Sequence, residues 1–200
     1  MKVILLALPR TGSSSIMNYI AETHKEIITI VEPFNTLIHK KTISYDRLVS
    51  YNSVFIKTMF ADNPPEFQKL THKDFVRKLH KDFDKVVCLF RKNKREHIES
   101  YAQAESTNRW VNQYKYYNEQ PALFDTLKKR IEAKEGEMIE ISNELGLQKY
   151  YYEDLYLSGN SDNMKEFFNN IGIRYHETFY QNYLDISKKY RINTVPDKLI

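Results

Sequence analysis

The sequence predicts an α/β protein: a single three-layer domain over residues 1–200, with a mainly parallel sheet of four or five strands flanked by helices. Two observations predict this class. Short apolar runs alternate along the chain with longer segments that carry apolar residues at helical spacing. The length of 200 residues, 42% of them hydrophobic, suits one well-cored domain and is short for two.

The strands are predicted from short apolar runs at residues 3–8, 27–31, 53–59, 85–91 and 148–152. The run at 85–91 is the clearest, because it is rich in β-branched residues and has a charge at each end. Glu32 and Pro33 end the second strand. Asn63, Pro64 and Pro65 separate the third strand from the helices that follow it.

The helices are predicted at residues 13–24, 65–82, 94–106, 120–145 and 161–171, with the second range holding more than one short helix. Ser13 is the expected N-cap of the first helix. Asn93 is the expected cap of the third, with Glu96 completing a capping box. Gly146 and Gly172 are natural stops for the last two helices. The final 20 residues show no clean period.

The composition narrows the classes of partner. Thirty basic and 26 acidic residues leave a net charge of +4, a milder asymmetry than nucleic-acid-binding proteins usually show. We therefore expect no nucleic-acid partner, whereas a small anionic ligand fits the balance. The lone Cys88 lies in an apolar run and excludes an internal disulfide or a cysteine-based zinc site. No apolar run approaches a membrane span, and the N-terminal run is too short for a signal peptide, so a soluble cytoplasmic protein is expected.

The loop after the first strand carries the strongest functional signal. It reads Pro-Arg-Thr-Gly-Ser-Ser-Ser over residues 9–15, between a buried strand and a helix. Backbone N–H groups at a helix start have no intrahelical partner, so this position attracts phosphate. Gly12 allows a close backbone approach, and Arg10 adds a planar cation suited to phosphate or sulfate oxygens. The predicted anion-binding set is Arg10, Thr11, Gly12, Ser13, Ser14 and Ser15.

This loop differs from the Walker A loop, which needs a first glycine and a lysine before the hydroxyl residue. Without that lysine, the loop is poorly equipped for ATP γ-phosphate chemistry. A sulfuryl group carries less negative charge than a terminal phosphoryl group and can be transferred without a metal. We therefore expect no metal ion, and the histidines show no metal-binding spacing.

Residues 9–14 match, in every defined position, the P-(K/R)-x-G-(S/T)-(S/T) loop of sulfotransferases that use 3′-phosphoadenosine 5′-phosphosulfate (PAPS), and the chain resembles that family. The resemblance implies a P-loop-like fold, PAPS as co-substrate, and a second basic group for the 3′-phosphate. Arg91, at the end of the fourth strand, and Ser100, on the following helix, match the family's residues for that role.

Further segments keep the family's order. The run from Arg91 to Ser100 resembles the R-R-D-K-x-x-Q-A-x-S of bacterial carbohydrate sulfotransferases of the trehalose type, with Asn93 and His97 as departures. The similar segments elsewhere are Glu32-Pro33-Phe34, residues 55–59, residues 107–110 and Tyr152-Glu153-Asp154-Leu155. A basic, glycine-containing loop that some branches place near the C-terminus is not visible.

The resemblance implies transfer of a sulfuryl group from PAPS to an acceptor hydroxyl, with a carbohydrate or another small molecule as the acceptor. Arg10 would stabilise the leaving phosphate electrostatically. Glu32, after the second strand, is the expected general base, with His39 as a remote alternative. Lys57 would hold the phosphosulfate or the acceptor. The remaining histidines are expected at the surface or in structural roles.

Two other functions stay open. A nucleotide kinase of the P-loop type would bind ATP with Mg²⁺, and the missing Walker lysine argues against it. A non-catalytic nucleotide-binding protein would keep the fold and the anion loop but have no acceptor site. The sequence names neither the acceptor nor the oligomeric state.

Overall fold

The computed structural model describes residues 1–35, 43–60, 62–107 and 121–177. Five parallel strands form one sheet in the order β2-β3-β1-β4-β5. The strands are β1 (Lys2–Ala7), β2 (Ile28–Val31), β3 (Val54–Met59), β4 (Lys85–Phe90) and β5 (Gln148–Tyr151). The predicted α/β class and all five predicted strands are confirmed. The assignment of residues 1–200 to one domain extends over segments outside the described residues and stays a prediction.

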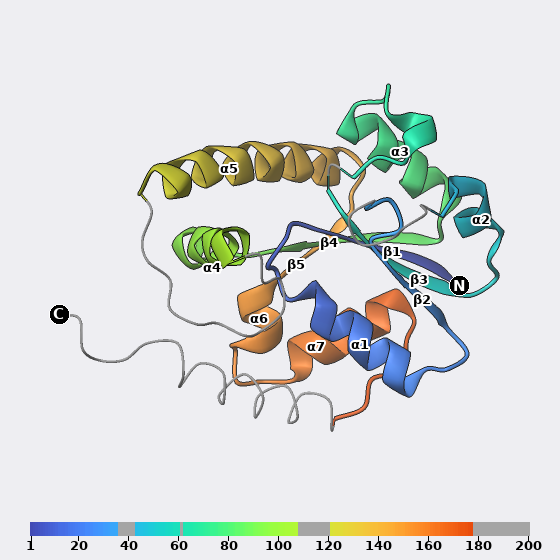
Figure 1. Ribbon diagram of the computed structural model, residues 1–200. Coiled ribbons are helices and arrows are strands. Elements are labelled where there is room, and N and C mark those ends of the chain that lie inside the picture. Colours follow the sequence, from blue (N-terminus) through green and yellow to red (C-terminus); the bar gives the residue numbers. More distant parts are fainter. Residues whose placement is uncertain (36–42, 61, 108–120, 178–200) are drawn as a thin grey trace.

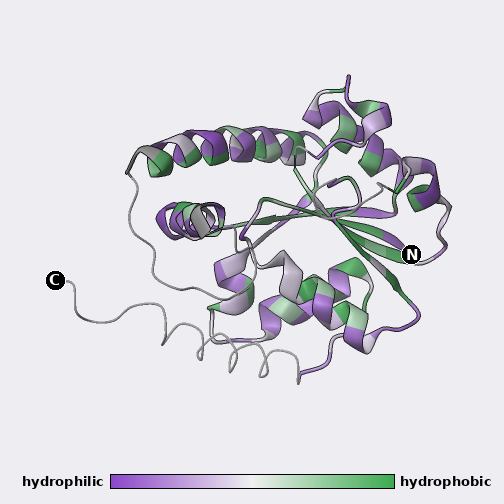
Figure 2. Ribbon diagram, viewed as in Figure 1, coloured by the Kyte–Doolittle hydropathy of each residue, from purple (hydrophilic) through white to green (hydrophobic). Residues whose placement is uncertain are grey.

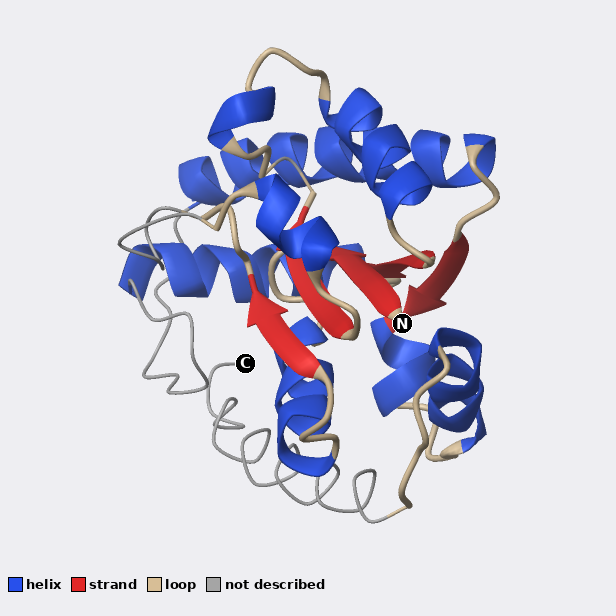
Figure 3. Cartoon of the chain, turned by 90° about the vertical axis from the view of Figure 1, so that its right-hand side faces the viewer, coloured by secondary structure: helices blue, strands red, loops and turns tan. Residues whose placement is uncertain are grey.

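Helices cover both faces of the sheet, which gives three layers (Figures 1 and 3). In Figure 1, α2, α3 and α5 lie above the sheet, α4 lies at its left-hand end, and α1, α6 and α7 lie below it. Their bounds are α1 (Ser13–Thr23), α2 (Tyr45–Ser50), α3 (His72–Asp82), α4 (Lys94–Thr107), α5 (Pro121–Glu144), α6 (Tyr152–Tyr156) and α7 (Asp162–Ile171), with a 3₁₀ turn, η1, at Pro65–Phe67. The short helices α2 and α6 were not predicted, because one or two turns show too little periodicity.

The core is divided by the sheet into two clusters. Along β1, Ile4 and Leu6 face the cluster under α3, α4 and α5, while Val3, Leu5 and Ala7 face the cluster under α1, α6 and α7. Successive side chains of a strand point to opposite faces, so a strand buried on both sides is apolar throughout. Figure 2 shows hydrophobic residues (green) along the central strands, and helices that carry both hydrophobic and hydrophilic (purple) residues.

Because all the strands are parallel, the loops that follow them leave the sheet at the same edge. From the central β1 the chain passes to β2 and β3 on one side, and later to β4 and β5 on the other. The loops after β1, β2, β3 and β4 therefore share the carboxyl edge. Ligands of open parallel sheets bind at this edge, where the strand order reverses.

None of the described helices is both long and apolar enough to cross a membrane.

Candidate functional site

The loop after β1 leaves extended structure through two residues of left-handed conformation. Arg10 has φ 67° and Gly12 has φ 83°. Gly12 is the N-cap of α1, so the prediction that Ser13 caps this helix was wrong. A left-handed cap costs glycine little because it has no Cβ, whereas Ser13 is already in the first helical turn. A positive φ at an arginine is uncommon and is held here by tertiary contacts.

Most of the hydroxyl side chains in this loop are buried or hydrogen-bonded within the protein. Thr11 is fully buried, and its hydroxyl donates to the carbonyl of Leu8 at 2.9 Å. The Ser15 side chain hydrogen-bonds to Tyr156, and Ser13 is buried. Of the four predicted hydroxyl residues, Ser14 is the exposed one. The loop therefore offers a ligand chiefly its backbone N–H groups and the Ser14 hydroxyl.

Helix α6 packs directly on Gly12. The Tyr156 hydroxyl donates to the carbonyl of Gly12 at 2.9 Å. A Cβ at Gly12 would lie 2.7 Å from Tyr152 Cδ2 and 2.9 Å from Tyr156 Cε2. The tyrosines of α6 therefore determine how closely the loop approaches this helix. Only glycine fits at position 12, because any Cβ would collide with Tyr152.

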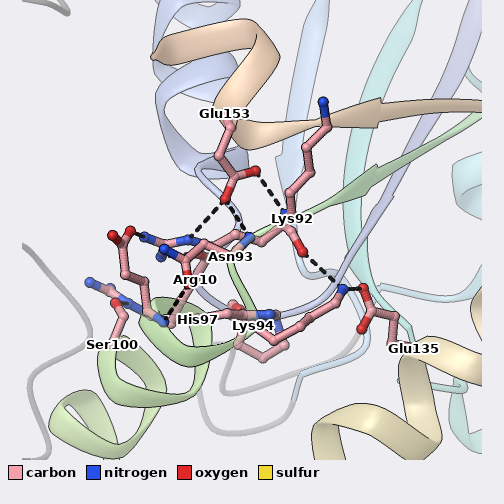
Figure 4. A network of polar contacts seen from close by, with 11 residues as sticks. Arg10, Lys92, Asn93, Lys94, His97, Ser100, Glu135 and Glu153 are labelled. Carbon is pink, nitrogen blue, oxygen red and sulfur yellow. Dashed lines mark hydrogen bonds and ion pairs between the residues drawn. The ribbon is translucent and has the colours of Figure 1, made fainter. Parts of the chain in front are cut away.

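The two predicted basic groups meet. Arg10 Nε donates to Ser100 Oγ at 3.1 Å (Figure 4). Arg91 Nη1 donates to the carbonyl of Arg10 at 3.3 Å. The resemblance assigned Arg10 to the leaving phosphate and Arg91 with Ser100 to the 3′-phosphate. The structure brings Arg10, Arg91 and Ser100 into one cluster. Burial, and next the adjacent Arg91, lower the pKa of Arg10, as expected where two cations share one place.

Carboxylates and an aromatic ring hold Arg91. Its Nη2 donates to Glu96 at 3.1 Å, its Nε lies 3.8 Å from Glu153 Oε1, and its guanidinium lies 4.7 Å from the centroid of the Tyr152 ring. Glu153 also accepts the backbone N–H groups of Lys92 at 2.8 Å and Asn93 at 3.0 Å. Glu153 therefore orients the β4–α4 turn, so that the arginine projects toward the loop after β1.

The predicted capping box forms only in part. The side chain of Asn93 accepts from the N–H of Glu96 at 3.2 Å, as expected for a cap. The return bond from Glu96 is missing from this pair, because Glu153 already accepts the N–H of Asn93 and the Glu96 carboxylate binds Arg91. Lys94 extends the network by donating to the carbonyl of Arg91 at 2.9 Å and pairing with the buried Glu135 of α5.

His97 supports the loop after β1, which agrees with the surface or structural roles expected for the histidines. It is fully buried, and its Nε2 lies 2.7 Å from the carbonyl of Pro9, so Nε2 carries the hydrogen. Burial lowers the pKa of His97 to about 4, which keeps the ring neutral. It lies three residues before Ser100, and residues i and i+3 share one helix face. Helix α4 thus contacts the loop through His97 and Ser100, one turn apart.

We expect His97 to make folding stability depend on pH. Unfolded, it takes up a proton near its ordinary pKa of 6.5; folded, it resists protonation down to about 4. The unfolded state binds more protons between these values, so stability falls as the pH is lowered from 6.5 to 4, by roughly 3 kcal/mol in total. His97→Gln does not titrate and keeps a donor for Pro9. In urea unfolding at several pH values, it should lose less stability than wild type on acidification. The exposed His80→Gln is the control; equal losses in His97→Gln and wild type would contradict a buried neutral imidazole.

A second polar group lies at the ends of β2 and β3. Lys57 Nζ binds Glu32 Oε1, and both side chains are buried. Asn35 Nδ2 donates to Glu32 Oε2 at 2.9 Å. Glu32 has φ 47° and, with Arg10, is one of the two non-glycine residues of positive φ in the described part of the chain. Both were predicted as catalytic residues from the sequence, and left-handed conformations of this kind cluster at functional sites.

The two groups flank the end of β1. Arg10 follows β1 and Arg91 follows β4, whereas Lys57 lies in β3 and Glu32 follows β2. The N–H of Phe60 donates to the carbonyl of Ala7 at 2.8 Å, which continues the pairing of β1 and β3 past their last ladder residues. The predicted site residues therefore lie along one edge. Their assignment to catalysis and nucleotide binding stays a prediction.

Some predictions concern residues outside the described ranges. His39, residues 108–110 of the similar segment at 107–110, and the final 20 residues belong to these. Within the described ranges, no group of three or more His, Cys, Asp or Glu side chains is arranged to hold a metal ion.

Comparisons with known proteins define the fold. No protein-family model and no curated protein matches the sequence. Among solved structures, mouse sulfotransferase SULT7A1 complexed with PAP is similar, with a TM-score of 0.58 and 13% sequence identity. The alignment covers 98% of this chain and 67% of that chain. The chain therefore shares its α/β fold with that sulfotransferase, as the resemblance of the N-terminal loop implied.

Proposed function

We propose that this protein is a PAPS-dependent sulfotransferase, which moves a sulfuryl group from PAPS to an acceptor hydroxyl. The observation that carries the proposal is the cluster of Arg10, Arg91 and Ser100 at the N-terminus of α1. It joins two arginines from neighbouring parallel strands to a helix start. Each of these features favours phosphate.

One cluster suits a nucleotide that carries two phosphates on one ribose. The 5′-phosphosulfate would lie against Arg10 and the N–H groups after Gly12. The 3′-phosphate would lie near Arg91 and Ser100. Burial and the nearby charge of Arg91 lower the pKa of Arg10, because the two cations repel each other. An anion bound between the two arginines would offset this repulsion and stabilise the charged form of both. The structure of mouse SULT7A1, which has the same fold, contains PAP, which we take to be adenosine 3′,5′-bisphosphate. This supports PAPS as the nucleotide of the present protein.

The chemical roles follow from residue type. PAPS supplies an activated sulfuryl group that needs no metal. Arg10, which stays protonated, and the α1 N–H groups would stabilise the charge that grows on the leaving phosphate. The Glu32–Lys57 pair would lie on the acceptor side, with Lys57 holding a sulfuryl oxygen or the acceptor and Glu32 as the sequence-predicted base.

The acceptor is proposed to be a small molecule, with a carbohydrate hydroxyl favoured by the similarity of residues 91–100 to the trehalose-type branch. Segments outside the described residues flank the site in sequence, so the acceptor is best found by experiment. A screen of sugars, lipids and small alcohols with radiolabelled PAPS serves this purpose.

The test of the function is isothermal calorimetry followed by transfer. We expect adenosine 3′,5′-bisphosphate to bind without added metal, and ATP with Mg²⁺ to bind far more weakly. Tight ATP binding that depends on Mg²⁺ would instead support a nucleotide kinase. Binding of the bisphosphate with no turnover of PAPS would support a non-catalytic nucleotide-binding protein.

A further inference from the structure

A second carboxylate, absent from the sequence prediction, lies beside Glu32. Asp62 is in the turn after β3, where its N–H donates to the carbonyl of Met59 at 3.1 Å. The same turn is tied to the end of β1 by the bond from Phe60 to Ala7, three residues before Arg10. Asp62 therefore belongs to the carboxyl edge that carries the other site residues.

The oxygens of the two carboxylates are used differently. Glu32 has Lys57 on Oε1 and Asn35 on Oε2. Asp62 Oδ2 is shielded from solvent and has no hydrogen-bond partner among the described residues. A buried acceptor without a partner costs about 1–3 kcal/mol, so such groups are uncommon and often functional. Asp62 Oδ2 therefore has an unused hydrogen-bonding capacity, which an acceptor hydroxyl would satisfy on displacing the groups that cover this oxygen.

Four charged or titratable side chains from other elements act electrostatically on Asp62. They are Glu32 after β2, Lys57 of β3, His72 of α3 and Lys134 of α5. Burial, and next the Glu32 charge, raise the pKa of Asp62 to about 6, while the three basic groups oppose the rise. Asp62 also acts electrostatically on Tyr101, the neighbour of Ser100 in α4. The carboxylate thus lies between the β2–β3 side of the edge and the helices that cover it.

A proton acceptor works best when its pKa is near the operating pH. Each oxygen of Glu32 already accepts a hydrogen bond, one from Lys57 and one from Asn35. Within the described part of the chain, Asp62 has no direct lysine partner of this kind. Position, an available oxygen and surrounding charge all favour Asp62 over Glu32.

We propose that Asp62 is the general base that takes the proton of the acceptor hydroxyl, while Glu32 balances the charge of Lys57. The inference rests on the proposed sulfuryl transfer. The acceptor oxygen forms a bond to sulfur as the bond from sulfur to the 5′-phosphate oxygen breaks, and the electron pair of that bond leaves with the phosphate. The hydroxyl proton passes to Asp62 Oδ2 and later to water. A base of this kind fits an aliphatic or sugar hydroxyl, which does not ionise by itself near neutral pH.

The test compares Asp62→Asn with Glu32→Gln. PAPS turnover is measured against pH with methyl glycosides, glycerol and water as acceptors, and bisphosphate affinity is measured for each variant. Asp62→Asn should lower turnover by about 100-fold or more with unchanged affinity, as expected for loss of a general base. Glu32→Gln should keep more activity, and its acidic limb should move to lower pH, because Glu32 raises the pKa of Asp62. The exposed Asp125→Asn on α5 is the matched control.

The outcomes separate the two proposals. Loss of turnover in Glu32→Gln, with Asp62→Asn within a few fold of wild type, would overturn the role of Asp62 and identify Glu32 as the base. Wild-type protein that binds the bisphosphate without turning over PAPS would overturn both the transfer and the base. If Asp62→Asn does not fold, the pH profiles of wild type and Glu32→Gln decide. An acidic limb near pH 6 that moves in Glu32→Gln supports Asp62, and one that stays in place excludes it.

Discussion

Replacement of Arg91 by alanine should weaken binding of adenosine 3′,5′-bisphosphate by about 10- to 100-fold, as expected for loss of a hydrogen bond between charged groups. The affinity for adenosine 5′-phosphate should fall much less. Arg91 touches the 5′ side only through the carbonyl of Arg10, whereas its guanidinium is the proposed partner of the 3′-phosphate. Calorimetry with the two nucleotides measures the difference directly.

Arg95→Ala is the control for this substitution. Arg95 lies four residues after Arg91, on α4; its side chain is 78% exposed and pairs with Glu99 one turn further along. It should leave both affinities unchanged. Equal weakening of both nucleotides by Arg91→Ala would show that Arg91 acts only by supporting the loop after β1, and would remove it from the 3′-phosphate site.

Replacement of Gly12 by alanine should abolish measurable nucleotide binding and destabilise the fold. The new Cβ would lie 2.7 Å from Tyr152, which requires the loop or α6 to move. The left-handed conformation adds about 1–2 kcal/mol for a residue with a Cβ. Movement of the loop displaces the N–H groups of α1 and the backbone of Arg10. Urea unfolding and calorimetry measure the two effects.

Gly136→Ala provides a matched control. Gly136 lies in α5, and a Cβ added there would meet nothing within 4 Å, so alanine should stabilise the helix and leave binding unchanged. The expected gain is about 0.5–1 kcal/mol. Combining Gly12→Ala with Tyr152→Ala should recover part of the stability, because the shortest steric contact is removed while the contact with Tyr156 and the backbone cost remain. No recovery in the double variant would show that the Tyr152 ring does not determine the position of the loop.

The sequence was sufficient for the order of the strands and the longer helices, and for the two polar segments that follow β1 and β4. Apolar periodicity predicted all five strands, and Pro121, Gly146 and Gly172 predicted ends of α5 and α7, because both signals are local. The loop at residues 9–15 and the Arg91–Ser100 pair were visible for the same reason, since each lies within ten residues at a strand end. The cap of α1 was misassigned, because Ser13 is a good N-cap in isolation and the tyrosines that favour Gly12 lie about 140 residues away.

Only the tertiary structure decided how these parts meet. Arg10 and Ser100 are 90 residues apart, and their hydrogen bond depends on β1 and β4 being neighbours in the sheet. Glu153 reaches the turn after Arg91 because β5 pairs with β4, and Asp62 is near Glu32 because β3 lies beside β2. Burial of His97 and the available oxygen of Asp62 follow from packing between elements. Local sequence determined which groups the edge of the sheet would carry, and strand order determined which of them lie in contact.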